Sequence, residues 1–573
     1  MKTSPPYKVR PISDLREMLS GSAAVFGDRP AFLRKKATFA DYEPVSYRRF
    51  QSDVDALGTA LLEMGQQGRR IAVIGENQYG WVTTYLAVVN GVGVIVPIDR
   101  ELPEEEIVRC LTRAGVSSVV FAESKRDVFR SIAAKLDFIE HYIDMGLTAD
   151  QAGFRSLNQL IALGHESMRR GGRRYLETVI DPQAVSVLLF TSATTSEAKV
   201  VPLSHRNLCE NMMATTSVVH FGPEDVLLSI LPIHHTYENM CGFLGPLYRG
   251  CAVAFCDGLR HIPRNLKESG CSVLITVPLV LETVYKRIWS EAEKSGKAAR
   301  LRRALGISNA LRRMGIDLRR RLFRPVLENL SPRLRLLVCG AAALSPQVSK
   351  GFDDLGIVTL QGYGLTECSP IVACNRDRAF KHDAAGLPVP GLDVRLRDID
   401  AEGMGEIVVR GPSVMSGYFE QPAETAKAFT ADGFFRTGDL GFIDEDGFVH
   451  ITGRSKNVIV AKNGKNIYPE EIEARIGLSP YVLECMVYGQ TDGQRNGDVE
   501  IVVSIVPAME SIAQTLGTQA PGTEDVRRML QDVVRGVNQA LPAYKRIHRI
   551  VVRETEFIKT TTKKIKRYLE KSV

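Results

Sequence analysis

Short apolar runs rich in β-branched residues alternate with amphipathic stretches through the first 340 residues of this 573-residue chain. Between several of the runs, apolar residues recur at helical spacing, as in RRFQSDVDALGTALLEMG (48–65). Such alternation predicts an α/β protein with a layered, mostly parallel sheet. The predicted strands are IAVIG (71–75), GVIVPI (93–98), SSVVFA (117–122), VSVLLF (185–190), DVLLSILP (225–232), AVAFC (252–256), CSVLITV (271–277) and LRLLVCG (334–340).

The pattern changes beyond about residue 385. Short strands with glycine-rich turns follow, as in GLDVRLRDIDAEGMGEIVVRGP (391–412) and GFIDEDGFVHITG (441–453). These segments predict a small antiparallel subdomain or barrel. After Gly453 the chain reads as a compact α/β tail, and we interpret residues 507–525 as a surface excursion inside it.

Length and composition indicate a protein of two to four packed domains. The N-terminal residues contain no apolar core of a signal peptide, and no run approaches twenty uninterrupted apolar residues. The ten cysteines are scattered without a CxxC pair, which favours buried, reduced thiols over disulfides or a zinc site. We therefore expect a cytoplasmic protein.

Positive charge is concentrated in two segments. Residues 286–324 hold thirteen Lys and Arg against three acids, and residues 545–573 hold ten against three. The two segments together carry +17, so the rest of the chain carries −10, which gives the net charge of +7. Neither segment interleaves aromatic residues with the basic ones, so we expect no nucleic-acid partner. The first segment is either a solvated helix face or a contact with an anionic lipid surface or a polyphosphate. A peripheral membrane contact is one expectation.

The segment LLFTSATTSEAKVVPLSHRNL (188–208) places a hydroxyl-rich loop after a predicted strand. Hydroxyls and turn N–H groups can donate to phosphate oxygens, and Lys199 adds a positive charge. The loop lacks the glycines of a P-loop. Alone, such a loop is more often an ordinary surface loop than a phosphate site. The candidate phosphate donors are Thr191, Ser192, Thr194, Thr195 and Lys199.

Four further stretches accompany this loop. They are LPIHHTYE (231–238), QGYGLTE (361–367), FRTGDLGF (435–442) with GRSKNVIVAKNGKNIYPEEIE (453–473), and IKTTTKKIKR (558–567). In this order the chain resembles the adenylate-forming superfamily of AMP-dependent synthetases and ligases, and most closely the long-chain fatty acyl-CoA synthetases. The resemblance implies an N-terminal AMP-binding domain over 1–455, with layered βα subdomains and a β-barrel-like subdomain. It also implies a small, mobile C-terminal cap domain over 456–573.

The resemblance also assigns roles around ATP. Tyr363 would offer its ring to adenine, with Gly362 and Gly364 permitting a tight backbone path. Thr366 and Glu367 would lie near the α-phosphate, and the Glu367 carboxylate would hold Mg²⁺, which prefers oxygen ligands. Two further residues, Asp439 and Arg454, would contact the ribose or a phosphate.

The remaining roles concern the two half-reactions. Lys564 would bridge the substrate carboxylate and the α-phosphate, where two anions meet and a cation is needed. His235 would lie beside the acyl pocket, although His234 competes for that role. Lys456 would be the hinge, and Gly464 would leave room for the pantetheine arm of coenzyme A.

The phosphate loop reads TSATTSEAKV where the family has TSGTTGxPKG, so four positions differ: Ala193, Ser196, Ala198 and Val200. All but Ala198 stand in place of glycines. Three functions therefore remain open. The first is ATP-dependent activation of a carboxylic, and specifically a fatty, acid, followed by transfer to coenzyme A. The second transfers the acyl group to a separate carrier protein. The third is a non-catalytic descendant that binds nucleotide or acyl groups. The apolar segment 273–285 is either acyl-tunnel lining or ordinary core.

Overall fold

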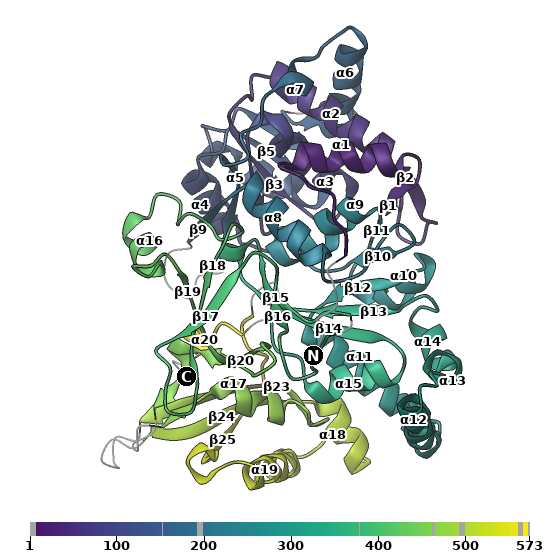
Figure 1. Ribbon diagram of the computed structural model, residues 1–573, viewed down its shortest axis with the longest axis vertical. Coiled ribbons are helices and arrows are strands. Elements are labelled where there is room, and N and C mark those ends of the chain that lie inside the picture. The colour runs from purple at the N-terminus through teal and green to yellow at the C-terminus, as the bar shows by residue number, and fades with distance from the viewer. Residues whose placement is uncertain are drawn as a thin grey trace. The chain divides into compact units, whose positions relative to one another are not determined.

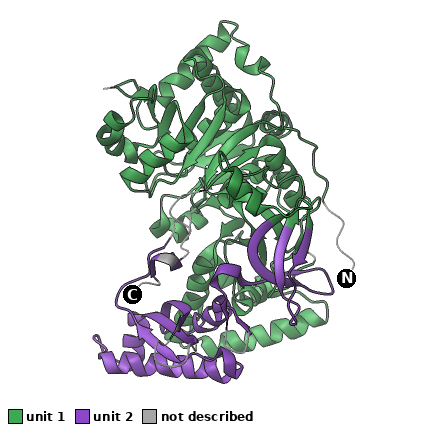
Figure 2. Ribbon diagram, turned by 90° about the vertical axis from the view of Figure 1, so that its left-hand side faces the viewer, with its two compact units in different colours: residues 1–193, 197–393, 409–435 green, residues 194–196, 394–408, 436–573 purple. Residues whose placement is uncertain are grey.

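The computed structural model describes residues 7–151, 153–191, 199–377, 379–460, 465–491, 499–559 and 565–570. Contacts divide the chain into two compact units (Figure 2). The first comprises residues 1–193, 197–393 and 409–435, and the second comprises residues 194–196, 394–408 and 436–573. A domain boundary between residues 455 and 456 stays a prediction.

A seven-stranded sheet forms one layer of the first unit, and its strands β3, β5 and β9 are labelled in Figure 1. Its strand order is β7-β6-β5-β3-β4-β8-β9. Its neighbouring strands are parallel except for the antiparallel pair β8 and β9. The strands are β3 (Arg70–Ile74), β4 (Val94–Ile98), β5 (Ser118–Phe121), β6 (His141–Asp144), β7 (Arg155–Ser156), β8 (Val185–Phe190) and β9 (Val200–Ser204). Helices of this region are α2 (Tyr47–Glu63), α3 (Tyr79–Ala87), α4 (Glu104–Ala114), α5 (Arg126–Ile132) and α6 (Leu157–Arg169).

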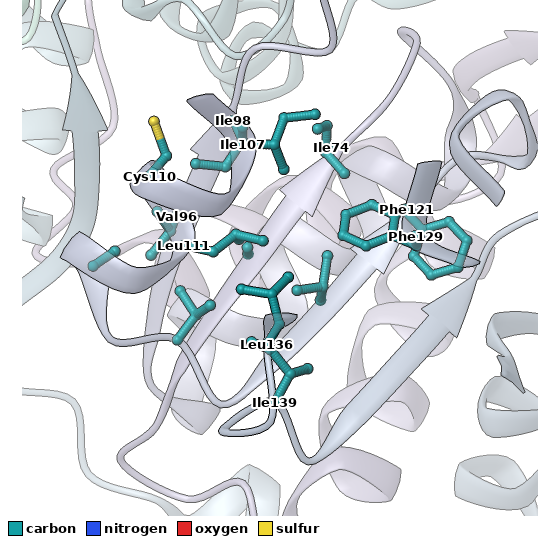
Figure 3. Close-up of a cluster of buried hydrophobic side chains, with 14 of the residues drawn as sticks. Ile74, Val96, Ile98, Ile107, Cys110, Leu111, Phe121, Phe129, Leu136 and Ile139 are labelled. Carbon is teal, nitrogen blue, oxygen red and sulfur yellow. The ribbon is translucent and has the colours of Figure 1, made fainter. Parts of the chain in front are cut away.

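One face of this sheet packs against α4 and α5 through buried aliphatic and aromatic side chains (Figure 3). Ile107 and Leu111 lie one helical turn apart on α4, so both point into the same core. Phe129 of α5 stacks on Phe121 of β5, with ring centres 4.6 Å apart. Each such side chain contributes about 1.5–3 kcal/mol when fully buried, which fixes the strands in place.

A nine-stranded sheet, β16-β15-β14-β13-β12-β10-β11-β1-β2, forms the other large layer of the first unit. The strands from β14 through β10 and β11 to β1 run parallel, so their carboxyl ends meet at one edge. The strands are β1 (Pro30–Arg34), β2 (Glu43–Ser46), β10 (Val226–Ser229), β11 (Ala252–Phe255), β12 (Val273–Thr276), β13 (Leu336–Cys339), β14 (Val358–Gly364), β15 (Ile371–Cys374) and β16 (Leu387–Pro388). Associated helices are α8 (His205–Thr216), η4 (Glu238–Leu244), α11 (Pro278–Lys294), α12 (Ala298–Arg313), α13 (Arg319–Leu322), α14 (Arg324–Leu330), α15 (Pro346–Asp354) and η6 (Thr366–Cys368).

The second unit contains most of a four-stranded sheet and an α/β region. The four strands are β17 (Asp393–Arg397), β18 (Gly405–Arg410), β19 (Phe435–Ile443) and β20 (Val449–Arg454). The α/β region has β23 (Val482–Thr491), β24 (Val499–Pro507) and β25 (Arg549–Val552), with helices α17 (Pro469–Ile476), α18 (Met509–Leu516) and α19 (Thr523–Gln539). The predicted α/β architecture, with a large N-terminal part and a smaller C-terminal one, is confirmed.

All eight predicted strands are present, and residues 507–525 are mostly exposed, as the interpretation of a surface excursion implies, although they include a helix. Met509–Leu516 forms α18, and its Ile512 is fully buried in the core of the α/β region. All ten cysteines are free thiols and eight are buried, as predicted. Among the described residues, no helix is both long and apolar enough to cross a membrane.

Candidate active site

Two of the sequence motifs, LPIHHTYE and QGYGLTE, lie at the carboxyl edge of the nine-stranded sheet. The loop after β10 carries His235 and Thr236, and η6 follows β14 directly with Thr366 and Glu367. The hydroxyls of Thr236 and Thr366 lie 3.4 Å apart, so the two motifs are in contact. Ligands of open α/β sheets bind at this edge, where several loops can present polar groups together.

The backbone around Tyr363 is tight at one glycine and not at the other. A Cβ on Gly364 would lie 2.1 Å from the carbonyl oxygen of Pro370, so no other residue fits there. A Cβ on Gly362 would meet only ordinary contacts, the nearest at 3.6 Å. The predicted steric need for glycine therefore holds at Gly364 alone, and Tyr363 between them is half-buried.

The turn after β13 is strained. Gly340 lets the Tyr237 ring approach, because a Cβ there would lie 2.8 Å from that ring. The Tyr237 hydroxyl donates to the carbonyl of Val338 at 3.0 Å, which ties the histidine-bearing loop to β13. Ala341 has φ +70°, a left-handed conformation that costs a residue with a Cβ about 1 kcal/mol.

Glu367 is held by a tyrosine from a distant segment. The Tyr418 hydroxyl donates to Glu367 Oε1 at 3.0 Å, and the Glu367 carbonyl accepts from the N–H of Met415 at 2.8 Å. Burial and the Glu367 carboxylate raise the pKa of Tyr418, so its hydroxyl keeps its proton. The carboxylate is thereby fixed at the sheet edge.

Lys199 of the phosphate loop lies against the same tyrosine. Its Nζ is 4.4 Å from the centre of the Tyr418 ring and 3.0 Å from Glu424 Oε2. Hydrogen bonds from Lys427 and Lys199 lower the pKa of Glu424 to about 2, so this carboxylate is ionised. The structure thus places Lys199 on the ring face of Tyr418 and Glu367 at its hydroxyl, with Glu424 as the partner of the lysine.

The base of the phosphate loop is a closed hairpin. Thr191 donates from its N–H to the Lys199 carbonyl at 2.9 Å, and its hydroxyl donates to the same oxygen at 3.3 Å. Val200 is fully buried in β9 and has no positive φ, so the expected strain from replacing glycine does not arise at this position. Ser192, Thr194 and Thr195, with Ala193 and Ser196, lie outside the described residues.

The two adjacent histidines differ in environment. Burial and the Arg100 guanidinium lower the pKa of His234 to about 3, so its ring is neutral. The rings of His234 and His235 are 4.4 Å apart, and His235 is half-buried next to Thr236. The role assigned to His235 beside the acyl pocket stays a prediction.

A buried acid ends the histidine motif. Glu238 is 1% exposed, accepts from the Ser229 hydroxyl at 2.6 Å, and leaves Oε2 without a hydrogen-bond partner. Burial raises the pKa of Glu238 to about 8, so the carboxyl is neutral at pH 7. Asn77 extends this network by donating to Ser229 at 2.8 Å and to the Leu231 carbonyl at 2.6 Å. The network fixes the start of the loop that carries the histidines.

An apolar cavity of about 30 Å³ lies next to Gly362 and Tyr237. Its lining includes Met212 of α8, Met240 of η4 and Ile275 of β12. Of the apolar segment 273–285, Ile275 lines this cavity, whereas Val273 and Leu274 are core residues. The strand half of the segment is thus buried, whereas Leu279 in its helical half is 42% exposed, and the choice between tunnel lining and core stays open.

The predicted ribose contacts lie together in the second unit. Asp439 of β19 and Arg454 of β20 are cross-strand partners, and Arg454 Nε is 2.9 Å from Asp439 Oδ1. Asp439 is 4% exposed, and its N–H donates to the Thr437 hydroxyl at 3.0 Å. Lys456 lies in the turn just after β20. Gly464 and Lys564 lie outside the described residues.

Within the part of the chain that the structure describes, no group of three or more His, Cys, Asp or Glu could hold a metal ion. A magnesium site would not need such a group, because Mg²⁺ keeps several waters and binds through one or two carboxylates together with substrate phosphates. Glu367 is the carboxylate that would serve, because it lies at the sheet edge beside the hydroxyl of Thr366.

Sequence reasoning missed Tyr418, Glu424 and Glu238. The Tyr418–Glu367 contact joins residues 51 positions apart, so no periodicity signals it. Glu238 ends the motif LPIHHTYE, and an acid among the apolar residues of a buried helix was the available signal.

The fold and this edge of the sheet define a class of protein. The chain matches the model of the AMP-binding enzyme family over residues 19–419 and that of the AMP-binding enzyme C-terminal domain over residues 456–569. It therefore belongs to the AMP-binding enzyme family, within the adenylate-forming superfamily.

Two relatives and one solved structure are similar to this chain over most of its length. The chain is similar to long-chain-fatty-acid–CoA ligase 5 of Rattus norvegicus, at 26% identity over 88% of this chain and 77% of the rat protein. It is 29% identical to long-chain-fatty-acid–CoA ligase FadD15 of Mycobacterium bovis, over 76% of this chain and 74% of the other. Among solved structures, ATP-bound MatB from Rhodopseudomonas palustris matches with a TM-score of 0.73 and 25% identity, over 97% of this chain and 98% of that one.

Proposed function

We propose that the protein is an acid–thiol ligase that converts a fatty acid to its coenzyme A thioester in two steps. The acid carboxylate first attacks the α-phosphorus of ATP, giving acyl-AMP and pyrophosphate. The thiol of coenzyme A then displaces AMP from the acyl carbon. The mixed anhydride is required because a carboxylate is itself a poor electrophile.

One observation carries this proposal: Glu367 is fixed by Tyr418 at the sheet edge, in contact range of the threonine-bearing loop. When bound there, Mg²⁺ would neutralise phosphate charge. Thr366 would orient a phosphate oxygen through its hydroxyl, and Lys199 would exchange Glu424 for a phosphate. Together, the metal ion, the Thr366 hydroxyl and Lys199 would place positive charge and hydrogen-bond donors where negative charge develops.

The second unit would supply the other contacts. Asp439 would accept from the ribose hydroxyls, and Arg454 would keep that carboxylate oriented. Lys564 would bring a cation to the carboxylate and the α-phosphate. After adenylation, rotation at Lys456 would present Gly464 to the pantetheine arm of coenzyme A.

The fatty character of the substrate rests on the names of the relatives and on the apolar cavity beside Gly362. At about 30 Å³ the cavity holds about two water molecules and is too small for an alkyl chain as it stands. Met212 and Met240 line it, and flexible thioether side chains can repack around a chain. His235 would lie between this cavity and the phosphates.

Product analysis tests the proposal. The protein is incubated with MgATP and acids of increasing chain length, with and without coenzyme A, and the products are separated by mass spectrometry. Acyl-CoA and AMP are expected with coenzyme A. Acyl-AMP that persists until a carrier protein is added would instead indicate a carrier-loading enzyme. Nucleotide binding without any acid-dependent product would indicate the non-catalytic descendant.

A further inference from the structure

Helix α12 presents an exposed face of unusual composition. Residues spaced three and four apart share one side of a helix, and on this side all of them are exposed. They are Arg300, Arg303, Ile307, Ala310 and Met314, which we call the outer face of α12. Ile307 is 60% exposed and Met314, at the C-cap, is 67% exposed. The face therefore combines cations in its first half with apolar side chains in its second.

The arginines of this region fall into two groups. Arg312 and Arg319 pair with Asp353 at 2.6 Å and 2.9 Å, so they fasten α12 and α13 to α15. Arg302 lies over the Trp289 ring of α11. By contrast, no ion pair neutralises Arg300 or Arg303 within residues 199–377, all of which are described. Two further arginines, Arg313 and Arg321, are exposed in the same way.

Negative charge is nearly absent from this surface. Between residues 294 and 324 the single acid is Asp317, and Arg319 already neutralises it at 2.8 Å. A solvated helix face would mix charges of both signs, as α4 does with Glu106 and Arg109. The outer face of α12 is thus complementary to a surface of uniform negative charge.

Exposed aliphatic side chains identify that surface. Ile316 and Leu322 follow α12 and are 47% and 42% exposed, which places four large apolar side chains within sixteen residues. No exposed aromatic residue accompanies them between 294 and 324, so nothing is available to stack on nucleic-acid bases. Aliphatic side chains between cations are the composition of helices that lie in a lipid headgroup layer.

We propose that the outer face of α12, with Ile316 and Leu322 after it, binds an anionic lipid bilayer. The arginines contact lipid phosphates, and the four apolar side chains enter the layer between headgroups. Helices α12, α13 and α14 follow one another at the edge of the ribbon (Figure 1), and all residues of the outer face of α12 are exposed. The inference is independent of the proposed function, because binding needs neither ATP nor a substrate.

Vesicle flotation of the full chain tests the proposal. The protein is mixed with phosphatidylcholine vesicles, with or without phosphatidylglycerol, and the double variant Arg300→Gln/Arg303→Gln is compared with it. We expect flotation only with phosphatidylglycerol, and a partition coefficient lowered roughly 25-fold in the variant. Ile307→Ser is also expected to lower the partition coefficient, and added salt is expected to abolish flotation.

A matched variant, Arg109→Gln/Arg113→Gln on α4, removes two exposed arginines elsewhere and should float like the wild type. Unfolding temperature and ATP turnover with a water-soluble acid should be unchanged in every variant. Equal loss in the α4 variant would overturn the proposal, because net charge alone would then be responsible. Absence of flotation with phosphatidylglycerol, or tighter binding to a DNA duplex than to vesicles, would overturn it as well.

Discussion

Tyr418 and Glu367 are joined by a 3.0 Å hydrogen bond between segments that the sequence keeps 51 residues apart. The same tyrosine carries Lys199 on its ring face. One tyrosine side chain therefore contacts both a cation and a carboxylate. In the proposed function these two groups bind a metal–phosphate complex together.

Removal of the Tyr418 hydroxyl should impair adenylation. In Tyr418→Phe the ring remains for Lys199, but Glu367 loses a hydrogen bond to a charged group, which is worth about 1.5–3 kcal/mol. We expect acid-dependent pyrophosphate release to fall at least about 10-fold in kcat/KM for ATP. Tyr142→Phe, which loses a hydrogen bond to the Leu136 carbonyl, is the control. Equal activity of the two variants would show that Tyr418 does not position Glu367.

Glu424 competes with phosphate for Lys199. In Glu424→Gln the lysine loses its ionised partner, so a phosphate no longer has to displace a carboxylate from it. We expect the KM for ATP to fall up to about 5-fold, with kcat little changed. Glu106→Gln, which breaks an exposed ion pair on α4, should leave the KM unaltered. A higher KM in Glu424→Gln would mean that the carboxylate orients the lysine instead of occupying it.

Backbone strain at Ala341 predicts asymmetric effects of substitution. Ala341→Val puts a β-branched residue at φ +70° and should lower the free energy of unfolding by about 1–2 kcal/mol. Ala341→Gly relieves the strain but adds freedom to the unfolded chain, so these effects nearly cancel. Ala343→Val, in the same turn without a positive φ, is the control. Denaturant unfolding that ranks Ala343→Val as the less stable valine variant would contradict this account.

The raised pKa of the buried Glu238 makes its contribution to the stability of the fold depend on pH. Its pKa is about 8 in the folded protein and near 4.5 when unfolded, so between these values the folded state binds the extra proton. The contribution of Glu238 to stability therefore declines as pH rises from about 5 to 8. Glu238→Gln keeps a neutral side chain, so its unfolding temperature should gain on the wild type across this range. A difference that does not change with pH would show that Glu238 is ionised when buried.

The strands and the family could be predicted because they depend on local patterns. Each predicted strand is a short run dominated by apolar residues, and the motif around Glu367 is contiguous in the chain. The partners of these motifs could not be predicted, because Tyr418 and Glu424 reach the site through the tertiary fold. The helix at Met509–Leu516 was missed although Met509, Ile512, Ala513 and Leu516 recur at helical spacing.

Exchange of radiolabelled pyrophosphate into ATP tests the central claim most directly, because it reports reversible formation of acyl-AMP without coenzyme A. The wild type should catalyse exchange that depends on both Mg²⁺ and a fatty acid, and Lys564→Ala and Glu367→Gln should lose it while remaining folded. Exchange that persists undiminished in both variants, or a wild type that shows none with any acid, would contradict the assignment of this sheet edge as an adenylation site.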